Sequence, residues 1–212
     1  MLVTQNLIKN YGAKPVFANL NVSFKRKHYC ISGVNGCGKT TLLTILAGIE
    51  PATAGKVTLN NASIHSAITR KKIGISSDRI VLPELLTAEQ LIRFHCQQHH
   101  CAYPTEIING LFFDIQLPNL VSALSLGSLK KLSLILALAH RPECLLLDEP
   151  TTGLDSSSRE WLLTHIANYR GIVIVTSHEA DFTDNPLYLQ LPFAQLQEQG
   201  EKKEEGKGEK VQ

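Results

Sequence analysis

The sequence lacks any apolar run close to the roughly 18 residues that a membrane-spanning helix needs. After Met1 there is no basic segment followed by an apolar core, so we expect no signal peptide. The five cysteines include no C-x-x-C pair, which favours reduced thiols in the cytosol. A formal net charge of only +2 gives no strong field for nucleic acid. We therefore expect a cytoplasmic chain that neither binds nucleic acid nor spans a membrane by itself.

The composition is that of an ordinary globular domain. With 212 residues and 43% hydrophobic residues, the chain can bury a full core. We predict one domain over residues 1–197. Residues 198–212 are rich in Glu, Lys and Gly and hold one large apolar residue, Val211, so we predict a disordered charged tail there.

The strongest local signal is a glycine-rich segment over residues 33–40 that matches the phosphate-binding pattern G-x-x-x-x-G-K-[ST]. It follows a predicted strand over residues 28–32 and opens a predicted helix over residues 41–47, the context that this motif requires. Glycine lets the backbone turn its N–H groups inward, and a helix N-terminus adds free donors for an anion. The predicted phosphate-binding residues are Gly33, Asn35, Gly36, Cys37, Gly38, Lys39, Thr40 and Thr41.

Two side chains of this segment are predicted to have separate tasks. Lys39 would reach the β- and γ-phosphates of a nucleotide, and the Thr40 hydroxyl would bind Mg²⁺. A glycine-rich turn with a chance lysine is the alternative. The context and a second motif downstream favour phosphate binding.

That second motif is an apolar run over residues 144–147 that ends in Asp148 and Glu149. Such a run suits a buried parallel strand. An enzyme with a phosphate loop needs one acidic group near Mg²⁺ and often another to polarise the attacking water. We assign Asp148 to the metal and Glu149 to the water. A strand that ends in a solvated acidic turn is the alternative for the pair taken alone.

The order of the predicted elements indicates an α/β fold. Further strands are predicted at 57–59, 73–75 and 171–176, and further helices at 128–140 and 156–168. Two more predicted helices, at 88–98 and 104–114, fall in a short helical insertion over residues 79–123, and Thr87 with Gln90 predicts a capping box. Residues 2–32 are typical of partly antiparallel β-structure. Alternating strands and helices predict a wound parallel sheet with ligands at the strand C-termini.

Taken together, these residues resemble the nucleotide-binding domain of the ATP-binding cassette (ABC) family over residues 2–193. The most specific piece is the segment Leu124–Ser128, which resembles the signature L-S-G-G-Q and lies about 20 residues before Asp148. The resemblance implies a RecA-like P-loop NTPase core with an N-terminal antiparallel β subdomain, and ATP and Mg²⁺ as cofactors. It also implies that Ser125 and Gly127 contact the γ-phosphate bound by the opposite subunit. Taken alone, Ser125 is also compatible with an ordinary helix N-cap.

Three other positions resemble the family one by one. Tyr11 resembles the aromatic residue that stacks on adenine, and a hairpin aromatic is the alternative. Residues 153–155 resemble the loop that crosses the dimer interface. His178 ends the predicted strand over residues 171–176 and resembles the histidine that contacts the γ-phosphate. The resemblance therefore implies three catalytic residues, Lys39, Glu149 and His178.

The sequence departs from the family pattern at two places. Where the family usually has a glutamine after the strand over residues 73–75, this chain has Asp78, which we predict as a metal ligand. A carboxylate can join a Mg²⁺ shell but cannot donate a hydrogen bond as an amide does. In the signature, Leu126 replaces a glycine and Ser128 replaces the glutamine. The leucine and the short insertion resemble ABC-2 type exporters and the haem-exporter ATPases of cytochrome c maturation.

The resemblance implies the ATPase subunit of a membrane transporter, with an exporter favoured. Two chains would close head to tail around two ATP molecules, with a membrane permease as a separate partner. The chain would be cytoplasmic and peripheral on the inner face of the membrane. The alternatives are a soluble ABC ATPase that acts on ribosomes or DNA and a degenerate, non-hydrolysing cassette. Asp78 and the altered signature favour the degenerate cassette, whereas intact Lys39, Asp148, Glu149 and His178 oppose it.

Residues 95–101, which read His-Cys-Gln-Gln-His-His-Cys, are of the types that bind metals. On a helix, His95 and His99 would share a face, as would Cys96 and His100. Their spacing matches no structural zinc pattern, so we interpret the segment as a polar helix end with incidental thiols. It is the first place to look if the transporter handles metal or haem.

Overall fold

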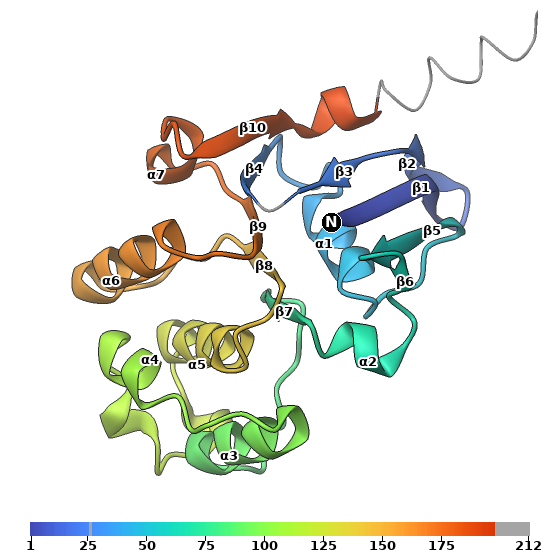
Figure 1. Ribbon diagram of the computed structural model, residues 1–212. Coiled ribbons are helices and arrows are strands. Elements are labelled where there is room, and N and C mark those ends of the chain that lie inside the picture. The colour runs from blue at the N-terminus through green and yellow to red at the C-terminus, as the bar shows by residue number, and fades with distance from the viewer. Residues whose placement is uncertain (26, 198–212) are drawn as a thin grey trace, which may run out of the picture.

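The computed structural model describes residues 1–25 and 27–197, so the tail predicted at 198–212 lies outside the described residues. Two sheets organise the chain, one parallel and one antiparallel. Helices cover the face of the parallel sheet that points away from the antiparallel sheet (Figure 1). Among the described residues, no helix combines the length and the apolar character that a membrane crossing requires.

The central sheet is parallel throughout. Its strands lie in the order β10 (Tyr188–Pro192), β4 (His28–Ser32), β9 (Ile172–Thr176), β8 (Cys144–Asp148) and β7 (Ile73–Ser76). Every residue of β8 and β9 is buried, as expected for apolar runs covered on both faces of a parallel sheet. The predicted α/β fold is confirmed.

The N-terminal sheet is antiparallel and mixes buried with exposed positions along each strand. Its order is β2 (Lys14–Leu20), β1 (Leu2–Tyr11), β5 (Ala54–Leu59) and β6 (Ala62–Ser63), and β3 (Ser23–Phe24) also pairs with β1. A sheet with one face on a core and the other toward water produces this mixture. The predicted antiparallel subdomain is therefore present.

Helices α1 to α7 and two short 3₁₀ turns connect these strands, and residues 193–197 after β10 are also helical. The labelled elements are α1 (Lys39–Leu46), α2 (Ala67–Arg70), α3 (Ala88–His99), α4 (Thr105–Gly110), α5 (Leu126–Ala139), α6 (Ser156–Ala167), α7 (Ala180–Thr183), η1 (Asp114–Gln116) and η2 (Val121–Ala123). Segment 79–123 carries α3, α4, η1 and η2.

Two helices show how local chemistry sets the boundaries. The capping box predicted before α3 is present: Thr87 Oγ1 accepts from the backbone N–H of Gln90 at 3.2 Å, and Gln90 Oε1 accepts from the N–H of Thr87 at 2.9 Å. The helix predicted at 104–114 is wrong at its end, because α4 stops at Gly110. Phe112 has a left-handed backbone with φ of 53°, which no α-helix can contain.

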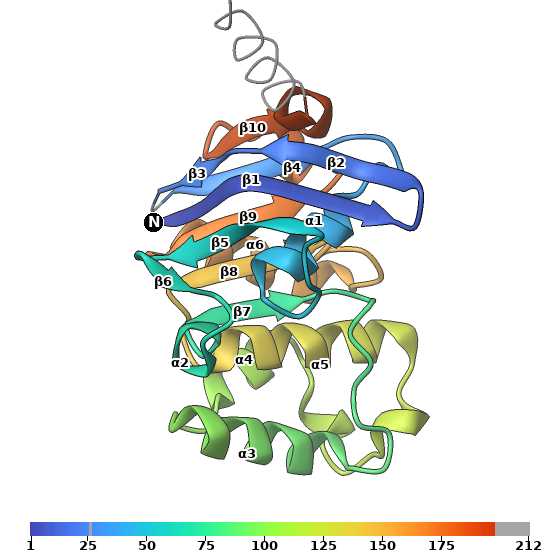
Figure 2. The same ribbon diagram turned by 90° about the vertical axis from the view of Figure 1, so that its right-hand side faces the viewer.

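Alternate residues of the central strands face two separate cores. In β8, Cys144 and Leu146 pack toward α1 and the antiparallel sheet, while Leu145 and Leu147 pack toward α3, α4, α5 and α6. Figure 1 shows α1 lying between the two sheets, and Figure 2 shows the antiparallel sheet in front of the central sheet. Because β4, β7, β8 and β9 are parallel and in register, their C-terminal ends meet at one edge, where the predicted site residues follow them.

Candidate active site

The phosphate loop joins the end of β4 to the start of α1. Gly36 and Gly38 have positive φ values of 78° and 116°, which favour glycine. At Gly38 an added Cβ would also lie 2.5 Å from Cγ1 of Val16, so the position has no room for a side chain. No side chain caps the N-terminus of α1, which leaves its first N–H groups free to bind an anion.

A cavity of about 670 Å³ opens over this loop and gathers most of the predicted residues in one place. Its lining includes Tyr11, Asn35, Gly36, Cys37, Gly38, Lys39, Thr40, Thr41, Asp78, Asp148 and Glu149. Lys14, Arg79 and Gln197 also line it and were not predicted. Four predicted residues are not among the lining residues: Gly33, Ser125, Gly127 and His178.

Lys39 is buried and turned back over its own loop. Its ammonium group donates to the carbonyl oxygen of Gly33 and, at 3.2 Å, to that of Val34. It also lies 3.1 Å from Nε2 of His178. The ammonium group of Lys39 therefore lies where the ends of β4 and β9 approach each other. The free N–H groups at the start of α1 are close by.

Asp148 receives hydroxyl groups from three segments. Its Oδ1 accepts from Thr176 at 2.5 Å and from Thr40 at 3.2 Å, and its Oδ2 accepts from Ser77 at 2.9 Å. The carboxylate is 8% exposed, so these donors offset its loss of hydration. Hard oxygen ligands of this kind suit Mg²⁺, and the adjacent oxygens of Thr40 and Asp148 fit the predicted metal position.

Glu149 directly follows β8 and has a left-handed backbone, with φ of 42°. This conformation is uncommon for a residue with a side chain and is typical of functional sites. Its Oε1 lies 4.0 Å from Nε2 of His178. Burial raises the pKa of the Glu149 carboxyl, and His178, Ser177 and Lys39 partly offset that rise. A carboxylate whose pKa is raised, with the positive charge of Lys39 nearby, suits a general base.

Asp78 lines the cavity but does not contact the other predicted metal ligands. Its carboxylate is 77% exposed and forms an ion pair of 2.6 Å with Lys130, a residue of α5 that is 5% exposed. Lys130 also donates to the carbonyl oxygen of Asp148 at 3.2 Å. The neighbouring Ser77 is the residue of this segment that hydrogen-bonds the Asp148 carboxylate. Neither Ser77 nor Lys130 was predicted, because only tertiary contacts reveal them.

Tyr11 lies at the cavity rim within a polar network. Its hydroxyl donates to Oε1 of Glu50 at 2.5 Å, and Nζ of Lys9 lies 4.7 Å from its ring centre. Although burial acts to raise it, the pKa of Glu50 is lowered by hydrogen bonds from Lys9, Tyr11 and Thr44. Glu50 is thus a charged anchor for Tyr11 that sequence reasoning missed.

Ser125 and Gly127 stand at the start of α5. The Ser125 hydroxyl accepts from the backbone N–H of Ser128 at 3.2 Å, so it is a helix N-cap, and α5 begins two residues before the predicted boundary. A Cβ added at Gly127 would lie 2.7 Å from the carbonyl oxygen of Gly153, so the two loops pack backbone against backbone. Leu126 between them is 86% exposed. This loop therefore presents its surface to solvent, outside the cavity of its own chain.

The position of Cys37 gives a direct test of ligand binding. We expect Mg-ATP at about 100 times its Kd to slow maleimide labelling of Cys37 about 100-fold, because the thiol lines the cavity and only the ligand-free fraction reacts. Peptide mapping after labelling measures this. Cys101, which is half-buried at a different cavity, is the internal control and should label equally with and without nucleotide. Equal protection of both thiols, or of neither, would contradict the assignment.

Comparison with known proteins places these features in a family. The model of the family described as ABC transporter matches residues 17–152. The chain is 30% identical over 190 residues to the linearmycin resistance ATP-binding protein LnrL of Bacillus subtilis. The match covers 84% of this chain and 61% of LnrL. It is 30% identical over 186 residues to the lantibiotic transport ATP-binding protein SrtF of Streptococcus pyogenes, covering 84% of this chain and 80% of SrtF.

Of two further matches, one covers only a small part of the relative and the other is to a solved structure. The ATP-binding protein Uup of Caulobacter vibrioides is 32% identical over 185 residues, but the match covers 85% of this chain and only 30% of Uup. The chain thus spans less than two-thirds of LnrL and of Uup. Among solved structures, the dimeric post-hydrolysis state of the ATP-binding cassette MJ0796 bound to ADP and Pi superposes with a TM-score of 0.74 at 23% identity, covering 85% of this chain and 89% of that one.

Proposed function

The chain belongs to the ABC transporter family, and from that premise we propose that it binds and hydrolyses ATP to drive a membrane transporter through a separate permease. One observation carries the proposal: a single cavity collects Lys39 and Thr40 from the start of α1 and Asp148 and Glu149 from the end of β8. These are the cation, hydroxyl and two carboxylates that hydrolysis of a phosphoanhydride requires.

The residues divide the chemistry among themselves. Glu149 accepts a proton from the water that attacks the γ-phosphate in line with the leaving oxygen. Lys39 leaves the carbonyl oxygens of Gly33 and Val34 and donates to the phosphate oxygens, where its charge offsets the charge that develops. His178, within 3.1 Å of Nζ of Lys39, donates to the same γ-phosphate.

The metal position is also part of the proposal. Thr40 and Asp148 would hold Mg²⁺, with Ser77 and Thr176 orienting the Asp148 carboxylate. Mg²⁺ supplies positive charge to the β- and γ-phosphate oxygens. Asp78, which lines the same cavity, is assigned to the outer water shell, since its carboxylate is paired with Lys130.

We infer that the complete site needs a second copy of the chain. Ser125 and Gly127 do not line their own cavity, and they lie at the N-terminus of α5, where the helix dipole suits an anion. In a head-to-tail dimer they would contact the γ-phosphate held by the partner's phosphate loop. The Gly127–Gly153 contact brings residues 153–155, the predicted interface loop, to the same surface.

The names of two relatives support a direction of transport. LnrL is named for resistance to linearmycin and SrtF for lantibiotic transport, which supports an exporter. The chain would then sit on the cytoplasmic face of the membrane, held by its permease. A degenerate cassette is the second candidate, and the exposed Leu126 in place of a signature glycine is the observation that favours it.

An ATPase assay on the purified chain separates these two functions. Because each composite site needs two copies, we expect Mg²⁺-dependent turnover per chain to rise with protein concentration until dimers dominate. Phosphate release, measured over a concentration series with saturating Mg-ATP, reports this. A matched series in EDTA sets the background. Turnover at background level at every concentration would leave the degenerate cassette as the better description.

A further inference from the structure

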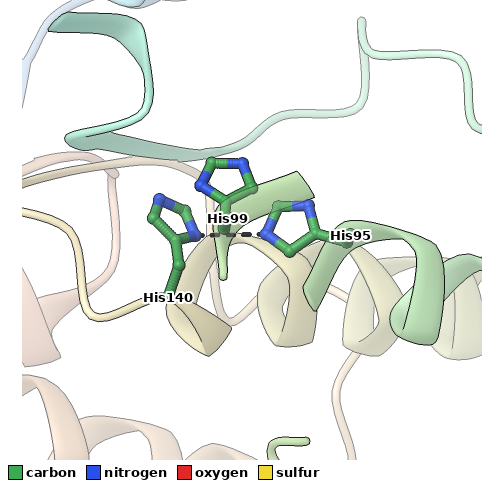
Figure 3. A group of neighbouring side chains, drawn as sticks. All are labelled: His95, His99 and His140. Carbon is green, nitrogen blue, oxygen red and sulfur yellow. Dashed lines mark hydrogen bonds between the residues drawn. The ribbon is translucent and has the colours of Figure 1, made fainter. Parts of the chain in front are cut away.

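A cluster of three histidines lies outside the nucleotide cavity and has no role in the proposed reaction. His95 and His99 lie one turn apart on α3, and His140 follows the last residue of α5. Their ring centres are 4.3 Å apart for His95 and His99, 4.0 Å for His99 and His140, and 5.1 Å for His95 and His140. Figure 3 shows the three rings converging from these two helices.

We propose that His95, His99 and His140 bind one divalent transition-metal ion of the Zn²⁺ class. One ring nitrogen from each residue can be chosen so that all three lie within 4.8 Å of one another. In tetrahedral zinc sites with imidazole ligands at about 2.0–2.1 Å, neighbouring nitrogens are about 3.3 Å apart. Nε2 of His95 and Nδ1 of His140 are already 3.1 Å apart. A rotation of the His99 side chain would bring its ring nitrogen toward this pair and complete the set of three ligands.

Packing alone does not explain the cluster. Across the three rings, one hydrogen bond joins His95 to His140, and the rings otherwise stack or tilt against one another. A metal ion in contact with the rings would replace weak mutual contacts with coordinate bonds.

The protonation state of the rings is compatible with a metal. Burial, together with the neighbouring imidazoles, lowers the pKa of His95 to about 3 and that of His140 to about 4. Burial and then Lys71 lower the pKa of His99. Neutral imidazoles keep a lone pair for coordination, which a protonated ring does not.

The surroundings select the type of ion. No carboxylate belongs to the cluster, so the hard cations Mg²⁺ and Ca²⁺ lack the oxygen ligands that they prefer. The three rings line a cavity of about 450 Å³, which leaves room for water or an anion as the fourth ligand. Lys71 lines the same cavity, but its ammonium group donates to the carbonyl oxygen of Gln98 at 2.6 Å. Its charge favours an anionic fourth ligand.

The proposal would replace the interpretation of residues 95–101 as a polar helix end with incidental thiols. His95 and His99 share a face, as expected for a helix, and the third member of their cluster is His140, at the end of a separate helix. Cys96 and His100 line a different cavity with Cys101. A metal held by the histidines would cross-link α3 to the end of α5.

Zinc itself is the probe for the test. We expect the metal-free wild-type chain to bind one Zn²⁺ in calorimetric titration, and Co²⁺ in its place to give visible absorption bands of a tetrahedral site. His95→Asn and His140→Asn should each weaken binding at least about 100-fold, beyond the 10–100-fold typical of losing an outer-shell partner. Zn²⁺ should also raise the melting temperature of the wild type but not of these variants.

His100→Asn is the matched control. His100 has a left-handed backbone with φ of 53°, which asparagine tolerates, and it lies on the same helix end outside the cluster. This variant should bind Zn²⁺ as the wild type does. Circular dichroism confirms that each variant is folded. Wild-type affinity in folded His95→Asn and His140→Asn chains, or no one-to-one binding by the wild type, would overturn the proposal.

Discussion

Glu149→Gln should bind ATP normally, hydrolyse it about 10²–10⁴-fold more slowly than the wild type, and accumulate as an ATP-bound dimer. Glutamine keeps the size of the side chain but cannot accept a proton from the attacking water. The dimer that ATP stabilises is then not released by hydrolysis. Because ATP that binds the closed form shifts the equilibrium toward it, saturating ATP should leave few monomers of the variant.

Size-exclusion chromatography with light scattering, with and without ATP, measures the dimer, and phosphate release measures turnover. Glu160→Gln, an exposed change on α6, is the control and should behave as the wild type. A folded Glu149→Gln chain that stays monomeric in saturating ATP would break the link between the phosphate loop of one copy and Ser125 of another. It would direct attention to Leu126 as the cause.

Lys39→Ala should lower turnover by at least about 10²–10³-fold, the usual effect of removing one group that stabilises charge in a transition state. Within residues 1–25 and 27–197, the polar partners of the ammonium group are two loop carbonyl oxygens and His178, so few contacts of the core are lost. The variant also removes a positive charge that lowers the pKa of Glu149.

Turnover, equilibrium ATP binding and thermal unfolding are the three measurements for this variant. Lys56→Ala is the control, because Lys56 is exposed on β5, away from the cavity. We expect unchanged turnover in the control and a cooperative unfolding transition in both variants. Wild-type turnover in folded Lys39→Ala would remove the phosphate loop from the mechanism.

Short-range patterns were sufficient to predict the fold and the centre of the site. The phosphate loop needs glycines at fixed spacing, and β8 needs a continuous apolar run, so both are visible in a few consecutive residues. Parallel strands then bring Lys39, Asp148 and Glu149 to one edge, without any further information from the sequence. The antiparallel sheet and the capping box of α3 followed in the same way.

What the sequence could not predict depends on contacts between distant segments. Lys130 sits on an apolar helix, and nothing in its neighbours indicates that Asp78 and the end of β8 meet its side chain. Glu50 is a lone acid until β1 brings Tyr11 beside it. His140 ends a helix in a separate part of the chain from His95. The early end of α4 depends on the backbone of Phe112, which no propensity of phenylalanine predicts.

The buried ammonium group of Lys130 connects α5 to two other segments of the chain. It joins the segment after β7, through Asp78, to the end of β8, through the carbonyl oxygen of Asp148. Separating these segments would leave the buried ammonium group of Lys130 without one of its partners, and a buried charge without its partner is strongly unfavourable. Lys130 therefore ties α5 both to the segment after β7 and to the end of β8, and the same helix begins next to Ser125, at the surface proposed for the second copy.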